Sequence, residues 1–126
     1  MEIRFENKVA FITGAAGGIG YAAARMFAEA GASVVMVDWD GQITDRAKEL
    51  EAEGHNAIGI RCDVSDEAQV KAAVEKAVAV FGKLDIAYNN VGIHAAVRED
   101  LAKTEGWDFD YVISVNLRGV WNCMKY

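Results

Sequence analysis

The stretch Val9-Ala10-Phe11-Ile12-Thr13-Gly14-Ala15-Ala16-Gly17-Gly18-Ile19-Gly20 runs directly into Tyr21-Ala22-Ala23-Ala24-Arg25-Met26-Phe27. The uncharged, mostly apolar segment 9–13 predicts a strand that is covered on both faces. The glycine cluster at 14–20 predicts a tight turn, and the alanine-rich segment after it predicts a helix. A strand that enters a helix through a glycine turn is typical of the first unit of a parallel α/β sheet.

The rest of the chain repeats this alternation. We expect strands at 8–13, 33–38, 57–62 and 84–89, and helices at 20–30, 42–53, 65–81 and from 105 or 107 to the C-terminus. Such alternation predicts βαβ units with right-handed crossovers. The expected fold class is α/β: a truncated doubly wound parallel sheet of half-Rossmann type, with strand order 3-2-1-4 and helices on both faces. Residues 1–126 are expected to form one domain.

Composition argues against several classes of protein. The 126 residues include 13 Lys and Arg against 19 Asp and Glu, for a net charge of −6. Nucleic-acid binding requires a basic surface, so we expect no nucleic-acid partner. No apolar run approaches the roughly 18 residues of a membrane span, and the N-terminus lacks a signal-peptide pattern. We therefore expect no membrane partner and a cytoplasmic location.

Cysteine and histidine are sparse. Cys62 and Cys123 belong to no Cys-x-x-Cys pair and are expected to be buried, reduced thiols. His55 and His94 lack nearby residues at metal-ligand spacing, so the sequence predicts no metal site.

The glycine turn predicts a site for an anion. Gly14 permits the turn out of the strand, Gly18 lets a pyrophosphate approach the backbone, and Gly20 lets the helix pack close to the sheet. The N–H groups at the start of the helix attract phosphate. The spacing is Gly-x-x-x-Gly-x-Gly. A strand before it, a helix after it and an acidic residue downstream, Asp38, favour a nucleotide site over an ordinary strand-to-helix turn.

Together with later segments, this turn resembles the cofactor motif of the short-chain dehydrogenase/reductase family. The matching segments are Thr13-Gly14-x-x-x-Gly18-Ile19-Gly20, Asp38, Asp63-Val64, Asn89-Asn90-Val91-Gly92 and Val115-Asn116-Leu117-Arg118-Gly119. They cover the whole chain in the family's order. The resemblance implies an oxidoreductase that, when complete, transfers hydride between a nicotinamide cofactor and a secondary alcohol or ketone.

The resemblance also implies a set of cofactor-binding residues: Gly14, Ala16, Gly17, Gly18, Ile19, Gly20, Asp38, Asp63, Val64, Asn90, Val91 and Gly92. Asp63 would accept a hydrogen bond from the adenine amino group, and the Val64 backbone would contact the ring. Asn90 and Gly92 would border the adenosine ribose. Val91 stands where the family usually has alanine.

Asp38 is expected to decide cofactor choice. It lies 18 residues after Gly20, close to the spacing of a carboxylate that binds ribose hydroxyls. A 2′-phosphate there would meet like charge. No Arg or Lys lies within 14–24 or 38–45 to hold that phosphate. The sequence therefore predicts NAD in preference to NADP.

Asn116 is the one member of the family's catalytic group that this sequence matches. The family uses a Tyr as general acid/base, a Lys four residues later that lowers its pKa, and a Ser. The residues four positions after Tyr21, Tyr88 and Tyr111 are Arg25, Gly92 and Val115, and Tyr126 is the last residue. We expect the chain, C-terminally truncated relative to the family, to be catalytically inactive alone.

Alternatives stay open at this point. The chain is interpreted as the NAD-binding part of an oxidoreductase, with a non-catalytic nucleotide-binding or assembly module and a degenerate gene product as alternatives. A methyltransferase also has a glycine turn after its first strand, but the Asn-Asn-x-Gly segment points elsewhere. The fourth strand would be an open edge, and the last helix is rich in apolar residues, so we expect a homo-oligomer.

Overall fold

The computed structural model describes residues 1–94 and 100–126. Four parallel strands form one sheet in the order β3-β2-β1-β4, as the alternation of elements predicted. The strands are β1 (Val9–Thr13), β2 (Ser33–Asp38), β3 (Ala57–Arg61) and β4 (Ile86–Tyr88). Their carboxyl ends, which carry the glycine turn and Asp38, therefore meet at one edge of the sheet.

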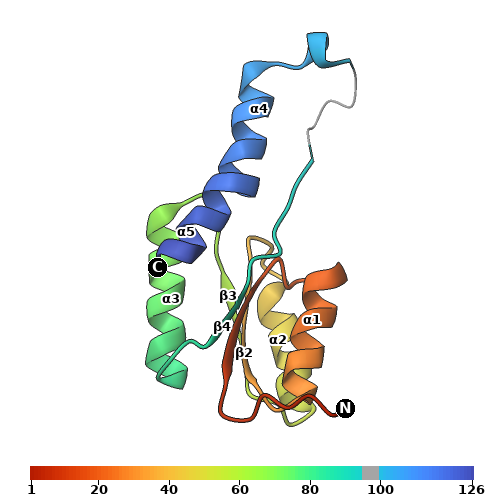
Figure 1. Cartoon of the computed structure of the whole chain (residues 1–126), viewed down its shortest axis with the longest axis vertical. Helices are drawn as coiled ribbons and strands as arrows, with labels where there is room; N and C mark the ends of the chain where they lie inside the picture. The colour runs from red at the N-terminus through yellow and green to blue at the C-terminus, as the bar shows by residue number, and fades with distance from the viewer. Residues whose placement is uncertain (95–99) are drawn as a thin grey trace.

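Helices cover both faces of this sheet (Figure 1). On one face lie α1 (Gly18–Glu29) and α2 (Ile43–Ala52), and on the other lie α3 (Glu67–Phe81) and α5 (Gly119–Lys125). Each face has its own apolar core, because successive strand side chains point to opposite sides. In β1, Ile12 packs toward α1 and α2, whereas Phe11 packs toward α3. All five β1 residues are buried.

The last helix is continuous but not uniform. It comprises α4 (Gly106–Ile113), a π-helical segment (Ser114–Arg118) and α5, and a short 3₁₀ turn (Leu101–Lys103) precedes it. The start at Gly106 lies between the two expected starts. Beyond the sheet, α4 extends away from the other elements (Figure 1). The helix packs on the rest of the fold through Val115 of the π-helical segment and through α5, where Asn122 Nδ2 donates to the Val64 carbonyl at 2.9 Å.

Some expected boundaries are corrected. The first helix begins at Gly18 rather than at 20, because Tyr21 N already donates to the Gly17 carbonyl at 3.2 Å. The third helix begins at Glu67, since the Asp66 carboxylate caps it by accepting from two backbone N–H groups. The strand expected at 84–89 is shorter, Ile86–Tyr88.

Side chains explain why β4 is short. Before it, the Asp85 carboxylate accepts from Val9 N at 2.8 Å. After it, Asn90 N donates to the Thr13 hydroxyl at 3.0 Å. Backbone groups that bond to side chains at both ends do not extend the ladder. Among the helices that the structure describes, none has the length and apolar character needed to cross a bilayer.

Candidate functional site

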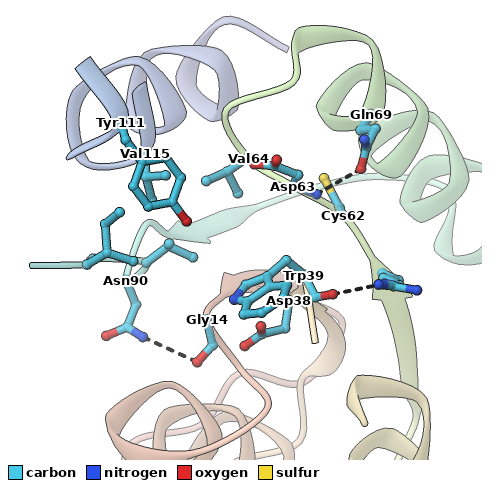
Figure 2. Close-up of a pocket in the computed structure, with 14 residues that line it drawn as sticks. Gly14, Asp38, Trp39, Cys62, Asp63, Val64, Gln69, Asn90, Tyr111 and Val115 are labelled. Carbon is cyan, nitrogen blue, oxygen red and sulfur yellow. Dashed lines mark hydrogen bonds between the residues drawn. The ribbon is translucent and has the colours of Figure 1, made fainter. Parts of the chain in front are cut away.

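A cleft of about 610 Å³ opens at the carboxyl ends of the strands. Ligands of open α/β sheets bind outside this edge, where strand order reverses, here between β1 and β4. Figure 2 shows Asp38 and Trp39 on one side of the opening, with Val64, Tyr111 and Val115 across from them. The described lining residues are Gly14, Asp38, Trp39, Arg61, Cys62, Asp63, Val64, Gln69, Asn90, Val91, Gly92, Ile93, Tyr111 and Val115.

Seven of the twelve cofactor-binding residues expected from the sequence line this cleft. They are Gly14, Asp38, Asp63, Val64, Asn90, Val91 and Gly92. The other five form the rest of the glycine turn and the start of α1: Ala16, Gly17, Gly18, Ile19 and Gly20. These five are continuous in sequence with Gly14, so the structure brings both groups to the same edge.

The glycine turn provides open backbone. Gly18 has a φ of +56°, which favours glycine, and a Cβ on Gly17 or Gly18 would meet no atom within 4 Å. No side chain caps the start of α1. The first N–H groups of a helix have no intrahelical partner and carry the positive end of its dipole. The open space and the uncapped N–H groups together fit a pyrophosphate. The glycine turn is therefore compatible with a bound dinucleotide.

Asp38 sits where β2 ends, with its carboxylate held by the backbone. Oδ2 accepts from Ala16 N at 3.1 Å, and Oδ1 accepts from Asp40 N at 3.0 Å. A carboxylate oxygen has capacity for further hydrogen bonds, so each can still accept from a hydroxyl. Asp38 therefore couples the glycine turn to the cleft and fits the role of a ribose ligand.

Thr13 joins the two central strand ends. It is only 2% exposed. Its hydroxyl accepts from Asn90 N at 3.0 Å and Val91 N at 3.3 Å, and donates to the Tyr88 carbonyl at 3.4 Å. One side chain thus positions the segment 90–92 as a wall of the cleft. The motif included Thr13, but the sequence indicated no role for it.

Asp63 and Val64 form the opposite wall. Asp63 Oδ1 accepts from Ser65 N at 2.9 Å and from Ser65 Oγ at 2.7 Å, while Asp63 N donates to Gln69 Oε1 at 2.9 Å. These bonds turn the chain sharply after β3 and leave Asp63 exposed at the rim. Gln69 lies six residues downstream of Asp63 and was not foreseen from the sequence.

Asn116 lies outside the lining but controls a lining segment. It is in the π-helical segment, a feature often found at functional sites. Its Oδ1 accepts from Ile93 N at 2.8 Å, and its Nδ2 donates to the Ile93 carbonyl at 2.7 Å. The side-chain amide therefore ties the segment after β4 to the last helix. Its expected catalytic role remains a prediction.

The cysteine in the cleft has an unreactive environment. Cys62 is 3% exposed, and burial raises the pKa of its thiol to about 12. Cys123 is only partly buried, contrary to expectation, but this burial still raises the pKa of its thiol to about 11. Thiolates are the nucleophiles, so at neutral pH both side chains remain neutral. Over residues 1–94 and 100–126, no cluster of three or more His, Cys, Asp or Glu could hold a metal ion.

Among the lining residues that the sequence analysis did not assign to the site are three large side chains, those of Trp39, Tyr111 and Arg61. Trp39 is 67% exposed, and Tyr111 is 55% exposed on α4. Arg61 ends β3, and its Nε donates to the Trp39 carbonyl at 2.9 Å. A fourth residue, Arg46 on α2, donates from Nε to the Ala16 carbonyl at 3.2 Å. Both arginines lie outside the segments 14–24 and 38–45, where a ligand for a 2′-phosphate would be expected from the sequence. Only the packing of α2 and the pairing of β3 with β2 bring them near the end of β2.

Known proteins resemble this chain over nearly its whole length. A family model described as short chain dehydrogenase matches residues 8–126. Secoisolariciresinol dehydrogenase of Forsythia intermedia is 43% identical over 98% of this chain and 44% of its own length. The mitochondrial borneol dehydrogenase of Lavandula x intermedia is 44% identical over 98% of this chain and 46% of its own length.

A solved structure agrees with the fold. The 3-ketoacyl-(acyl-carrier-protein) reductase from Brucella melitensis, crystallised with NADH, superposes with a TM-score of 0.83 at 41% identity. The match covers 95% of this chain and 48% of that reductase. The chain thus spans about half the length of the relatives that it matches. By its sequence from residue 8 to residue 126 and by the arrangement of its sheet, the chain belongs to the short-chain dehydrogenase family.

Proposed function

We propose that this chain is the NAD-binding part of an oxidoreductase and that it prefers NAD to NADP. One observation carries the proposal: the open glycine turn and the Asp38 carboxylate are joined by the bond from Ala16 N and lie at one cleft. A nicotinamide dinucleotide, when bound, supplies hydride transfer to or from a secondary alcohol or ketone. The solved reductase with NADH has the same fold over this region.

In this proposal the residues of the chain bind the dinucleotide and orient it. The N–H groups of Gly18, Ile19 and Gly20 hold the pyrophosphate, and Asp38 accepts from the ribose hydroxyls. Asp63 and Val64 contact the adenine. Asn90, Val91 and Gly92 border the adenosine ribose, positioned by the Thr13 hydroxyl. Asn116 keeps the adjoining segment in place through Ile93.

Calorimetric titration of the 126-residue chain tests the proposal. We expect ADP-ribose to bind about as tightly as NAD, because the assigned residues all contact the adenosine and phosphate parts. NADP should bind at least about tenfold more weakly, since its 2′-phosphate is repelled by Asp38. No turnover of a secondary alcohol is expected, because no Tyr in the chain precedes a Lys by four residues. Binding of NAD without measurable binding of ADP-ribose would contradict the assignment.

An assembly role is the second candidate. Large apolar side chains are exposed along α4 and its continuation: Trp107, Phe109, Tyr111, Leu117, Trp121 and Met124. Leu117, Trp121 and Met124 follow the i, i+4, i+7 spacing of one helix stripe. A contiguous exposed apolar patch marks an interaction site. We propose that this stripe mediates homo-oligomer formation.

Light scattering at high protein concentration should therefore give a mass above that of one chain. Leu117→Glu places a charge in the stripe and should shift the protein toward monomer. Val80→Glu makes the same change at an exposed position of α3 and serves as the matched control. A monomeric native chain, or equal effects of the two substitutions, would count against the stripe.

A further inference from the structure

Arg61 and Asp38 are neighbours across two strands. The register of β2 and β3 pairs Asp38 with Arg61 at the last rung of the ladder. Partners in adjacent strands lie about 5 Å apart, and their side chains leave the sheet on the same face. The oppositely charged side chains of Asp38 and Arg61 therefore leave adjacent backbone positions on the same face of the sheet. Both residues line the cleft.

The guanidinium group of Arg61 is only partly used. Its Nε donates to the Trp39 carbonyl at 2.9 Å, an interaction drawn as a dashed line in Figure 2. Within the described residues, Nη1 and Nη2 form no hydrogen bond, and Arg61 has no ion pair within 4.0 Å. Arg61 is exposed, and it is the one cationic side chain among the described residues that line the cleft.

The other nearby arginine is occupied. Arg46 donates from Nε to Ala16 O, and its Nη1 pairs with Glu49 at 2.9 Å. It is not among the residues that line the cleft. Of the two arginines near the end of β2, only Arg61 both lines the cleft and has N–H groups available to an anion there.

We infer that Arg61 is a second determinant of cofactor choice, which attracts a 2′-phosphate and so opposes the repulsion by Asp38. The inference rests on the proposed binding of adenosine at this cleft. An adenosine ribose held by Asp38 presents its 2′-oxygen beside that carboxylate, at the end of β2 that pairs with Arg61. A planar guanidinium suits a phosphate, with which it forms charge-assisted hydrogen bonds. In the native chain Arg61 therefore weakens the preference for NAD over NADP that Asp38 produces.

The test is the ratio of two affinities, measured by calorimetry with 5′-AMP and adenosine 2′,5′-bisphosphate. These probes differ only in the 2′-phosphate. Asp38→Asn removes the negative charge and keeps the shape, and it should raise the affinity for adenosine 2′,5′-bisphosphate relative to 5′-AMP by about tenfold or more. Arg61→Gln in the Asp38→Asn background should abolish this gain. Arg61→Gln alone should lower the ratio further below its native value.

A matched control separates a local contact from net charge. Lys71→Gln removes one positive charge from an exposed α3 side chain that pairs with Glu75, and it should leave the ratio unchanged. Measurements at about 0.15 M ionic strength limit long-range effects, because the Debye length there is about 8 Å. Circular dichroism of each variant checks that the sheet is retained.

The outcomes distinguish this inference from the proposed function. If 5′-AMP does not bind the native chain, the nucleotide site itself is wrong and the inference fails with it. If 5′-AMP binds but Arg61→Gln leaves the gain in the Asp38→Asn background intact, only the role of Arg61 is wrong. The same conclusion follows if Lys71→Gln lowers the ratio as much as Arg61→Gln, or if Arg46→Gln removes the gain instead.

Discussion

Gly20→Ala is expected to destabilise the chain by about 3 kcal/mol or more, at the upper end for overpacking substitutions. A Cβ at this position would lie 2.0 Å from the Gly14 carbonyl oxygen and 2.7 Å from Asn90 Nδ2. The nearest atom belongs to backbone, so a rotamer change cannot relieve the contact. Either α1 moves away from the sheet or the glycine turn shifts, and both changes disturb the cleft. Urea denaturation of the two proteins, followed by circular dichroism, measures the loss.

Gly41→Ala is the matched control for this result. A Cβ on Gly41 would meet no atom within 4 Å, and its backbone lies outside the positive-φ region. The same chemical change should therefore leave the urea midpoint almost unchanged. If Gly20→Ala also left the midpoint unchanged, the close approach of α1 to the turn would be wrong. Failure of Gly20→Ala to fold, with Gly41→Ala folded, would agree with the prediction.

Thr13→Val should reduce both stability and nucleotide binding. Valine keeps the shape of the buried side chain but removes the hydroxyl that bonds to Asn90 N, Val91 N and the Tyr88 carbonyl. Leaving buried polar groups unsatisfied costs about 1–3 kcal/mol each, so we expect a loss of about 2 kcal/mol in the free energy of unfolding. The affinity for ADP-ribose should fall about tenfold, because the segment 90–92 loses its anchor.

Thr13→Ser separates the hydroxyl from the methyl group. Serine retains the hydrogen bonds and loses one buried methyl, so stability should fall by only about 1 kcal/mol while ADP-ribose binding is largely retained. Urea midpoints and calorimetric titrations of both variants provide the comparison. Equal loss of affinity in the serine and valine variants would show that packing, and not the hydroxyl, positions this wall.

The sequence predicted the fold well because its signals are local. The glycine turn, the apolar runs and the glycines after helices act within a few residues of chain, and they predicted the order of elements. The strand order 3-2-1-4 followed by analogy with the half-Rossmann fold and is confirmed. The boundaries were less accurate where tertiary contacts intervene. The fourth strand ends early because the Thr13 hydroxyl takes the N–H of Asn90, a residue 77 positions away. The π-helical segment around Asn116 had no sequence signal.

The candidate site was predicted in the same uneven way. Residues with a motif of their own, such as Asp38 and Asp63, were identified and lie at the cleft. Arg61 was missed because the search for a cation covered only segments close to the turn in sequence. It meets the Trp39 carbonyl from 22 residues away, through the pairing of β2 with β3.

The sequence by itself therefore determined the elements, their alternation and the positions where only glycine fits, because these depend on local backbone sterics and apolar periodicity. The tertiary structure decided which residues lie together: Thr13 with Asn90 and Val91, Asn116 with Ile93, and Asp38 with its strand partner Arg61. Which of these residues lie together depends on strand register. Register is set when the apolar side chains of both sheet faces are buried at once, and no local segment contains that information.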